Sequence, residues 1–343
     1  MPADDRLFAV TLRFSDGIER ALDVAPGESV LTAALRAGYP LVHQCEEGSC
    51  GTCVARQVAG SSADLPGRAL ALLPGEIRDG YRLTCSIAPT AACTFELNYP
   101  STFLSGPQPA IHAAEVTELT WVAESVARLE LTLAEPWDFT FASGQYVRIR
   151  VPGTDHWRSY SMATSPKELP RLQFLIRHLE GGAMSGWLRQ ACKVEDAVEI
   201  EGPLGSFGLA AGKGPVLMVA GGTGLAPMLA MLDSLRARPG PKPPMLLCFG
   251  CTGAGDLFYL DEIELRGFWM PTFQSRIALM EPDAGFSGKI GTSVSLLEEP
   301  DMARTGLTAY LCGPPAMVEA ARERLLAAGV AADAIHAEQF RAT

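Results

Sequence analysis

The sequence predicts a multidomain protein: a small β-rich domain, then an antiparallel β-barrel, then an α/β domain with an open parallel sheet. A chain of 343 residues is longer than one core usually supports. Its middle has short strands separated by glycines, and in its last third strands alternate with helices. We place the domains at 1–100, 111–210 and 211–343, with a linker at 101–110.

The composition limits the possible partners. The 28 lysines and arginines are outnumbered by 39 aspartates and glutamates, a formal charge of −11. Such an acidic chain repels phosphate backbones and anionic lipids, so neither nucleic acid nor a membrane is expected as a partner. The opening residues, MPADDRLFAV, lack a basic segment followed by an apolar one. We therefore expect no export signal and a cytoplasmic protein.

Four of the nine cysteines follow a recognisable spacing. The stretch CEEGSCGTC holds Cys45, Cys50 and Cys53, and Cys85 follows after 31 further residues. Because the cytoplasm keeps thiols reduced, clustered cysteines there indicate metal or redox chemistry. The pattern C-x4-C-x2-C followed by a distant cysteine is the plant-type [2Fe–2S] ligand spacing. We expect these four cysteines to bind such a cluster.

Three other kinds of site fit less well. Structural zinc usually takes two Cys-x2-Cys pairs, and only one is present. A redox Cys-x-x-Cys would not require Cys45 or Cys85. A Rieske centre needs two histidine ligands, and His43 is not matched by another histidine nearby. The remaining isolated cysteines are expected to be small buried apolar residues: Cys93, Cys192, Cys248 and Cys251.

The elements around the cysteine loop suit a small β domain. Strand-like segments at 7–14 and 17–24 flank a turn at Ser15-Asp16-Gly17, which predicts a hairpin. Residues 29–38 predict a short helix with Ser29 as its N-cap. A hairpin, a helix, a cluster loop with small residues and further strands resemble the β-grasp fold of plant-type ferredoxins, over about residues 5–98.

The middle region carries two motifs on a predicted barrel. Strand candidates are 144–151, 172–178 and 197–205. The motif RSYS, residues 158–161, places Arg158 and Tyr160 on one face of a strand. The motif EGGAMSGWL predicts a glycine turn and then a helix opened by Ser185, whose free amides would form an anion site. An ordinary serine-capped glycine turn is the alternative.

The last region predicts a nucleotide-binding sheet. A buried strand from Pro215 passes through a glycine turn, Gly221–Gly224, into a helix, although the turn is not the G-x-G-x-x-G fingerprint. Further strands are predicted at 245–250, 275–280 and 307–315, and a helix at 315–329. Ligands of open parallel sheets bind at the carboxyl ends of the strands, where the glycine turn and Cys312–Pro315 fall.

The order of these motifs resembles a known family. RSYS, GGAMS, GGTGLAPM and CGPP, in that order, resemble the ferredoxin–NAD(P)+ reductase superfamily over about residues 111–343. With the cysteine pattern in front, the whole chain resembles the reductase component of bacterial ring-hydroxylating dioxygenases, such as benzoate and terephthalate dioxygenase reductases. Reductases of some di-iron monooxygenases share this arrangement.

The resemblance implies a role for each motif. Arg158 would pair with the flavin phosphate, Tyr160 would lie against the isoalloxazine, and Ser161 would reach its N5. The other residues that it assigns to FAD are Ser159, Ile176, Arg177, His178, Gly182, Ala183, Met184, Ser185 and Phe340. Those that it assigns to NADH are Gly221, Gly222, Thr223, Gly224, Asp256, Cys312, Gly313 and Pro314. Ser161, Cys312 and Glu338 would be the catalytic residues.

The resemblance also implies a function. Electrons from NADH would pass through FAD and the [2Fe–2S] cluster to a terminal oxygenase component that binds the aromatic substrate. A di-iron monooxygenase is an alternative acceptor, and a flavin/iron–sulfur redox sensor is an alternative of another class. We expect the chain on its own to be a monomer.

Overall fold

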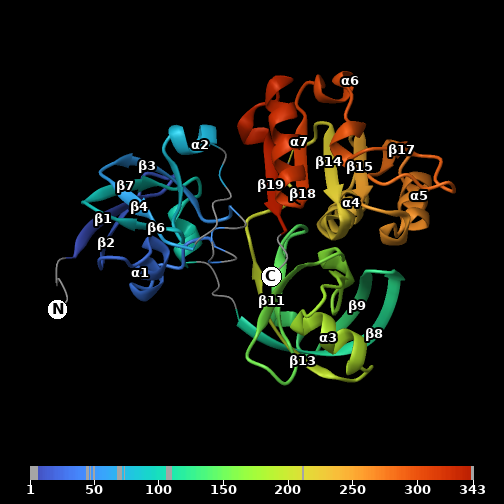
Figure 1. The fold of residues 1–343 in the computed structure, drawn as a ribbon, viewed down its shortest axis with the longest axis horizontal. Helices are drawn as coiled ribbons and strands as arrows, with labels where there is room; N and C mark the ends of the chain where they lie inside the picture. Colours follow the sequence, from blue (N-terminus) through green and yellow to red (C-terminus); the bar gives the residue numbers. More distant parts are fainter. Residues whose placement is uncertain are drawn as a thin grey trace. The chain divides into compact units, whose positions relative to one another are not determined.

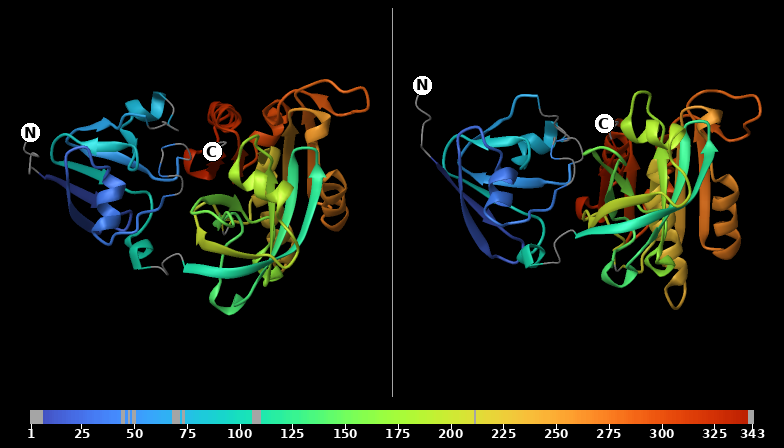
Figure 2. Two further views of the ribbon diagram at one scale, coloured as in Figure 1. Left: turned by 60° about the horizontal axis from the view of Figure 1, so that its bottom comes forward. Right: turned by 90° about the horizontal axis from the view of Figure 1, so that it is seen from below.

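The computed structural model describes residues 7–43, 46, 48, 51–67, 72, 74–105, 110–210 and 212–340. Packing divides the chain into two compact units, Met1–Gln108 and Pro109–Thr343. Each has its own buried core, and the two can be followed by colour, blue to cyan and then green to red (Figures 1 and 2). The second unit contains both the antiparallel barrel and the parallel sheet. The domain boundaries remain predictions.

The N-terminal unit is a mixed β-sheet with one longer helix against it. Its five-stranded sheet has the order β2-β1-β7-β3-β5, with β1 antiparallel to β2 and parallel to β7, and β4 pairs separately with β6. The elements are β1 Phe8–Arg13, β2 Glu19–Val24, α1 Val30–Arg36, β3 Val54–Ala59, β4 Ser62–Asp64, α2 Pro74–Arg78, β5 Tyr81–Leu83, β6 Ile87–Pro89, β7 Cys93–Glu96 and η1 Ser101–Ser105.

Local sequence signals explain the first elements of this unit. Gly17 has φ +81° in the predicted β1–β2 turn, a conformation that glycine adopts without a steric cost. The Ser29 side chain accepts a hydrogen bond from the Thr32 amide at 3.0 Å and caps α1 as predicted. Gly38, with φ +79°, follows the end of the helix.

The start of the predicted linker is part of the N-terminal unit. Tyr99 is buried, and its ring lies 5.9 Å from that of Phe14 and 5.5 Å from that of Phe103. The amide and the hydroxyl of Ser101 both donate to the Asp16 carboxylate, at 2.8 and 2.7 Å. The predicted linker is rich in proline and small polar residues, yet it is anchored to the N-terminal unit up to the end of η1.

The first half of the second unit is an antiparallel barrel. Its strand order is β11-β10-β13-β8-β9-β12, and a bridge between Met162 and Phe174 joins the two outer strands. Its apolar core faces inward from alternate strand positions, as a barrel requires. The elements are β8 Ala110–Ala123, β9 Val126–Leu133, η2 Pro136–Asp138, β10 Tyr146–Arg150, β11 Trp157–Ser161, η3 Pro166–Glu168, β12 Arg171–Arg177, α3 Ala183–Gln190 and β13 Ala197–Leu204.

The second half is a parallel sheet of order β17-β16-β15-β14-β18-β19. Alternate residues of β14 enter two cores: Met218 packs with residues of α4 and α5, and Leu217 packs with residues of α7. The elements are β14 Val216–Gly221, η4 Gly222–Gly224, α4 Leu225–Ala237, β15 Met245–Cys251, η5 Ala254–Asp256, α5 Leu260–Trp269, β16 Phe273–Leu279, β17 Lys289–Ile290, η6 Ser293–Leu296, α6 Glu299–Met302, β18 Thr308–Gly313, α7 Pro315–Ala327, η7 Ala332–Ala334 and β19 Ile335–Gln339.

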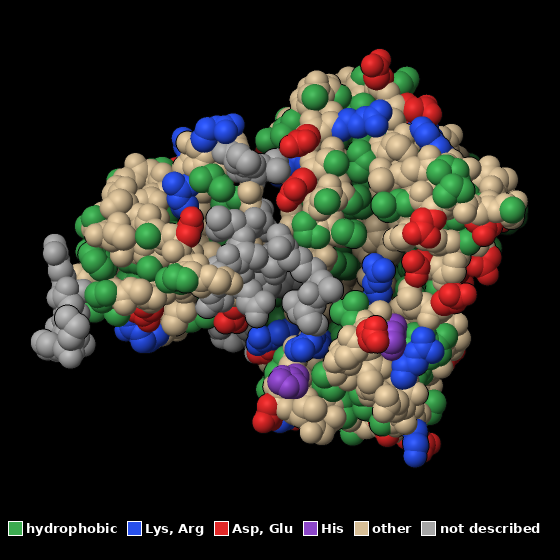
Figure 3. Space-filling view, viewed as in Figure 1, with side chains coloured by type: hydrophobic (Ala, Val, Ile, Leu, Met, Phe, Trp, Pro, Cys, Tyr) green, Lys and Arg blue, Asp and Glu red, His purple; other side chains and the backbone are tan. Residues whose placement is uncertain are grey.

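The surface carries charges of both signs. Acidic and basic side chains are interspersed over the face of the parallel-sheet half that is visible in Figure 3, and many form ion pairs. Within the described ranges, no helix combines the length and the apolar character needed to cross a membrane.

Separate cores predict separate responses to mutation. Phe95 is fully buried in the N-terminal unit and Phe174 in the barrel. Phe95→Ala should lower the free energy of unfolding of its own unit by about 3–5 kcal/mol, because it leaves a cavity and removes apolar contacts. Peptide-resolved hydrogen exchange should then show faster exchange in residues 8–96 and unchanged exchange in the second unit. Phe174→Ala is the matched control and should give the reverse pattern. Faster exchange across both units with either variant would contradict independent cores.

Candidate functional site

Two of the four predicted cluster ligands face each other in the N-terminal unit. Antiparallel pairing of Val54 with Leu83 brings the start of β3 beside the end of β5. Cys53 and Cys85 therefore lie side by side, both buried, with their Sγ atoms 3.2 Å apart. A disulfide would need about 2.05 Å, so these are unbridged thiols.

Buried, unbridged and adjacent sulfurs suit thiolate ligation of a [2Fe–2S] cluster. Cys45 and Cys50 lie outside the described residues. Of the loop around them, Gly48 and Gly51 have φ +80° and +77°, so both use the left-handed conformation that a tightly wrapped loop needs.

The RSYS motif forms strand β11 at the edge of the barrel. Arg158 and Tyr160 are both half-buried on one face, whereas Ser159 is exposed and Ser161 is buried. The neighbouring part of the predicted flavin site comes from β12, where Ile176 lies in the barrel core and Arg177 is exposed. His178 follows this strand, and its amide donates to the Ser125 carbonyl at 2.7 Å.

The helix at the predicted pyrophosphate site begins two residues earlier than expected. Helix α3 starts at Ala183, and its N-cap Gly182 supplies no side-chain hydrogen bond. Ser185 does not open the helix; its buried hydroxyl instead accepts a hydrogen bond from the Leu179 amide at 2.8 Å. The serine therefore secures the preceding glycine turn. The uncapped first amides of α3, including those of Ala183 and Met184, suit an anion such as a pyrophosphate.

The glycine turn after β14 is packed against the end of β18. Parallel pairing of Ala220 with Cys312 sets the two strand ends side by side. A Cβ on Gly224 would lie 2.2 Å from the Cys312 carbonyl oxygen, and one on Gly313 would lie 3.0 Å from the Gly221 nitrogen. A Cβ on Gly222 would meet nothing within 4 Å. Backbone packing thus leaves one side of the turn open, as an approaching dinucleotide requires.

A buried hydrogen bond joins the barrel to the parallel sheet. Cys312 and Glu338 are register partners on β18 and β19, and Ser161 at the end of β11 donates from Oγ to Glu338 Oε2 at 3.0 Å. All three side chains are at least 96% buried, with exposures of 4%, 0% and 3% for Ser161, Cys312 and Glu338. The three predicted catalytic residues are therefore brought together.

Burial changes the proton affinity of this group. It raises the pKa of the Glu338 carboxyl to about 8, and the Ser161 hydrogen bond lowers it by less. Burial also raises the pKa of the Cys312 thiol well above its ordinary value. At pH 7 the carboxyl and the thiol are then both neutral. Neutral groups favour the approach of an uncharged ring, and they can hold a proton beside that ring. Phe340 packs nearby, and its amide donates to the Gly313 carbonyl at 2.8 Å.

Asp256 contacts the barrel, and one of the isolated cysteines is less buried than expected. Asp256 ends η5, and its carboxylate accepts a hydrogen bond from the Ser125 hydroxyl of the barrel. Thr223 lies in η4, within the glycine turn, and Pro314 precedes α7. Among the isolated cysteines, Cys192 is only half-buried, and the others are buried as expected.

Three domain families match the chain. An iron–sulfur family, the 2Fe-2S iron-sulfur cluster binding domain, matches residues 13–90. The oxidoreductase FAD-binding and NAD-binding domains match 113–208 and 218–323. The toluate 1,2-dioxygenase electron transfer component of Pseudomonas putida is 35% identical over 97% of this chain and 98% of its own. The chain belongs to the reductase components of bacterial ring-hydroxylating dioxygenases.

Other relatives of this reductase have similar coverage. The anthranilate 1,2-dioxygenase electron transfer component of Acinetobacter baylyi is 32% identical over 97% of both chains. The crystal structure of the Amycolatopsis cytochrome P450 reductase GcoB has a TM-score of 0.71 and 31% identity, over 97% of this chain and 98% of that one. The chain is an NADH-dependent iron–sulfur flavoprotein whose cofactors are a [2Fe–2S] cluster, FAD and NADH, and it transfers electrons to an oxygenase component.

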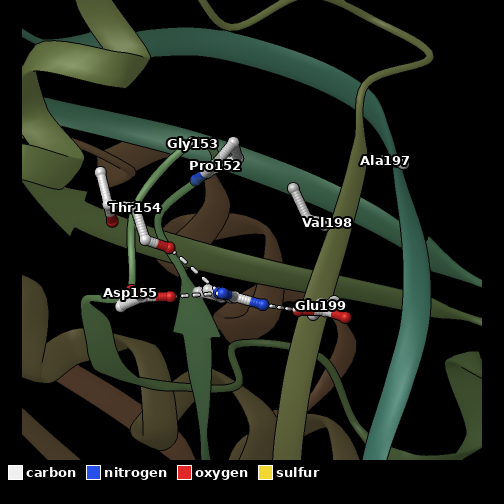
Figure 4. Close-up of a pocket in the computed structure, with 8 residues that line it drawn as sticks. Pro152, Gly153, Thr154, Asp155, Ala197, Val198 and Glu199 are labelled. Atoms are coloured by element: carbon white, nitrogen blue, oxygen red, sulfur yellow. Dashed lines mark hydrogen bonds and ion pairs between the residues drawn. The ribbon is translucent and has the colours of Figure 1, made fainter.

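A pocket elsewhere on the reductase has different chemistry. It has a volume of about 400 Å³ and lies between the β10–β11 loop and β13 (Figure 4). Arg150 crosses it and bonds to Asp155 at 2.6 Å, Glu199 at 2.8 Å and the Thr154 carbonyl at 3.0 Å. Arg150 pairs with Trp157, at the opposite end of β11 from Ser161. The charges of Arg150, Asp155 and Glu199 are thus paired with one another.

The buried carboxyl predicts a dependence of stability on pH. The folded pKa of Glu338, about 8, lies above the ordinary value of 4.5, so the folded reductase holds a proton that the unfolded chain has released between these values. Its stabilising effect is complete below pH 4.5 and is lost as the pH rises through 8. From this group, the free energy of unfolding should fall by at most about 1.4 kcal/mol per pH unit.

Urea unfolding between pH 5 and 8.5 measures this slope. Glu338→Gln should flatten it, whereas Glu264→Gln, which changes an exposed carboxylate on α5, should not. Equal slopes in the wild type and Glu338→Gln would show that Glu338 is ionised at neutral pH.

Proposed function

We propose that the acceptor is the terminal oxygenase component of an aromatic-ring-hydroxylating dioxygenase. The near-complete coverage of two dioxygenase electron transfer components supports this acceptor. The observation that carries the reductase chemistry is the buried contact of Ser161 and Glu338 beside Cys312 at the strand ends. It lies between the predicted flavin strand and the predicted nicotinamide edge.

In this proposal, each element of the second unit holds part of a bound molecule. The uncapped amides at the start of α3 and the guanidinium of Arg158 bind the flavin phosphates. The open side of the Gly221–Gly224 turn binds the NADH pyrophosphate, and Cys312 with Gly313 and Pro314 borders the nicotinamide. Ser161 and Glu338 orient the flavin ring and exclude water from it. When bound, FAD would supply hydride acceptance from NADH and single-electron release, and a [2Fe–2S] cluster would supply single-electron transfer.

A monooxygenase is the second candidate acceptor. The propane 2-monooxygenase reductase component of Mycolicibacterium goodii is 34% identical over 94% of this chain, between the 35% and 32% of the two dioxygenase components. The anthranilate component has a similar identity. Reconstitution with a purified terminal oxygenase of each class separates the two. We further propose that the reductase acts as a monomer in the cytoplasm, with domains at 1–100, 111–210 and 211–343.

The proposed electron path predicts a selective loss of function. Cys85→Ser removes one thiolate, so the purified variant should lose its iron and sulfide but keep FAD and NADH-dependent ferricyanide reduction. Transfer to a single-electron protein acceptor, cytochrome c, should fall by roughly a hundredfold. Cys93→Ala is the matched control, because Cys93 is a buried cysteine in the same core and not a predicted ligand. Retained iron in Cys85→Ser, or zinc in the wild type, would refute the cluster assignment.

The charges near the proposed nucleotide site predict a preference for NADH. Selectivity for NADPH needs a cation for its 2′-phosphate, and residues 243–265 contain no lysine or arginine. Beyond them, Arg266 is paired with Asp233 and Glu262. NADH should therefore exceed NADPH by at least roughly tenfold in kcat/KM, about 1.4 kcal/mol. Steady-state rates with both nucleotides test this. Equal use would contradict it and would implicate Arg177, the exposed cation at the end of β12.

A further inference from the structure

The tip of the β8–β9 hairpin contacts the loop that follows β15. The Glu124 amide donates to the Gly255 carbonyl at 3.0 Å, and the Ser125 hydroxyl donates to the Asp256 carboxylate. A Cβ on Gly255 would lie 2.8 Å from the Glu124 carboxylate, so the two residues are in close contact. Residues far apart in the sequence thus join the barrel to the parallel-sheet half.

The same hairpin tip is also bonded to the two elements that hold the flavin in the proposed function. The Ser125 carbonyl accepts from the His178 amide, directly after β12, at 2.7 Å. The Glu124 carbonyl accepts from Arg189 of α3 at 2.9 Å, and the Arg189 guanidinium lies 3.6 Å from the centre of the Trp121 ring. The tip therefore connects β12 and α3 on one side with η5 on the other.

A second contact lies beside the first. Tyr259 precedes α5 with φ +58° and ψ +29°, a left-handed conformation that is uncommon for a bulky residue. Its hydroxyl accepts a hydrogen bond from Gln173 of β12 at 2.7 Å. Such backbone strain costs about 1–3 kcal/mol and persists where surrounding contacts hold it. The strained residue and the hairpin tip thus fix both ends of the segment 254–259 to the barrel.

We propose that Ser125–Asp256 and Gln173–Tyr259 form an interdomain clamp that sets the spacing between the flavin strand and the nucleotide-binding edge. Asp256 is then a positioning residue and not a nucleotide ligand. The inference rests on the proposed function, in which hydride transfer occurs across this spacing.

The clamp can act on the reaction because its loop is coupled to the glycine turn. β15 pairs with β14 up to Gly221 and Gly250, so the strand end that leads into η5 lies beside the glycine turn. Displacement of η5 would move this strand end and the turn beside it. A misplacement of about 1 Å between reacting groups can slow a reaction by roughly a hundredfold. A contact that only adds stability would not alter the rate of that single step.

The experiment uses holoenzymes and compares three variants with the wild type: Ser125→Ala, Asp256→Asn and Tyr259→Phe. Stopped-flow absorbance gives the limiting rate of flavin reduction by NADH, titration gives the NAD+ dissociation constant, and hydrogen exchange reports on 253–262. Each variant should lower the limiting rate by roughly tenfold, leave the dissociation constant within about twofold, and speed exchange in this segment. Thr120→Ala is the control, because it removes an exposed hydroxyl that bonds to Glu118 on the same strand.

The outcomes separate the clamp from its alternatives. A weaker NAD+ affinity in Asp256→Asn with an unchanged limiting rate would make Asp256 a nucleotide ligand and overturn the proposal. Unchanged rate and exchange in all three variants would also overturn it. The double variant Ser125→Ala/Asp256→Asn should be no slower than either single variant, and additive losses would contradict a shared contact. If NADH fails to reduce the flavin even in the wild type, the proposed function fails, while the exchange data still test the contact itself.

Discussion

Parallel pairing of β14 with β15 on one side and β18 on the other is the constraint on which the candidate site depends. The pairs run in register from Val216 to the strand ends, so Gly250 lies beside Gly221 and Cys312 beside Ala220. The site does not depend on a side chain that reaches over a long distance. Backbone hydrogen bonds fix the register of these strands. They therefore bring together the glycine turn, the buried thiol and, through β19, the buried carboxyl.

That convergence requires two unfavourable features. Main chain meets main chain where Gly224 and Gly313 approach the neighbouring strand ends, which admits no other residue type without displacement. Glu338 is buried and accepts a hydrogen bond from Ser161, and burial that hydrogen bonds do not fully compensate is costly for a carboxyl. Proteins keep such features mostly where chemistry needs them, because strain and perturbed proton affinity concentrate at functional sites.

Sequence reasoning was strongest where a pattern is local. The cysteine spacing, the Ser29 cap and the four motifs of the second unit each lie within a few residues, and the strands and turns follow them. It was weaker where a role depends on a partner far along the chain. Ser185 is of a residue type that often begins a helix, yet its hydroxyl accepts a hydrogen bond from the Leu179 amide. Ser125 and Tyr259 have no local signature, because the contacts of Ser125 with Asp256 and of Tyr259 with Gln173 depend on how the barrel packs. Spacing alone does not encode such packing.

The anchoring of Tyr99 and Ser101 has a consequence for protein engineering. A designer who fuses this ferredoxin-like unit to another reductase, or exchanges it for another electron carrier, needs a crossover point that leaves both cores intact. Composition would place that point near residue 100, within the segment that binds Asp16 and packs between Phe14 and Phe103. A cut there would leave a buried aromatic side chain without its cover. Chimeras joined after Ser105 keep the whole anchored segment with the unit that it completes.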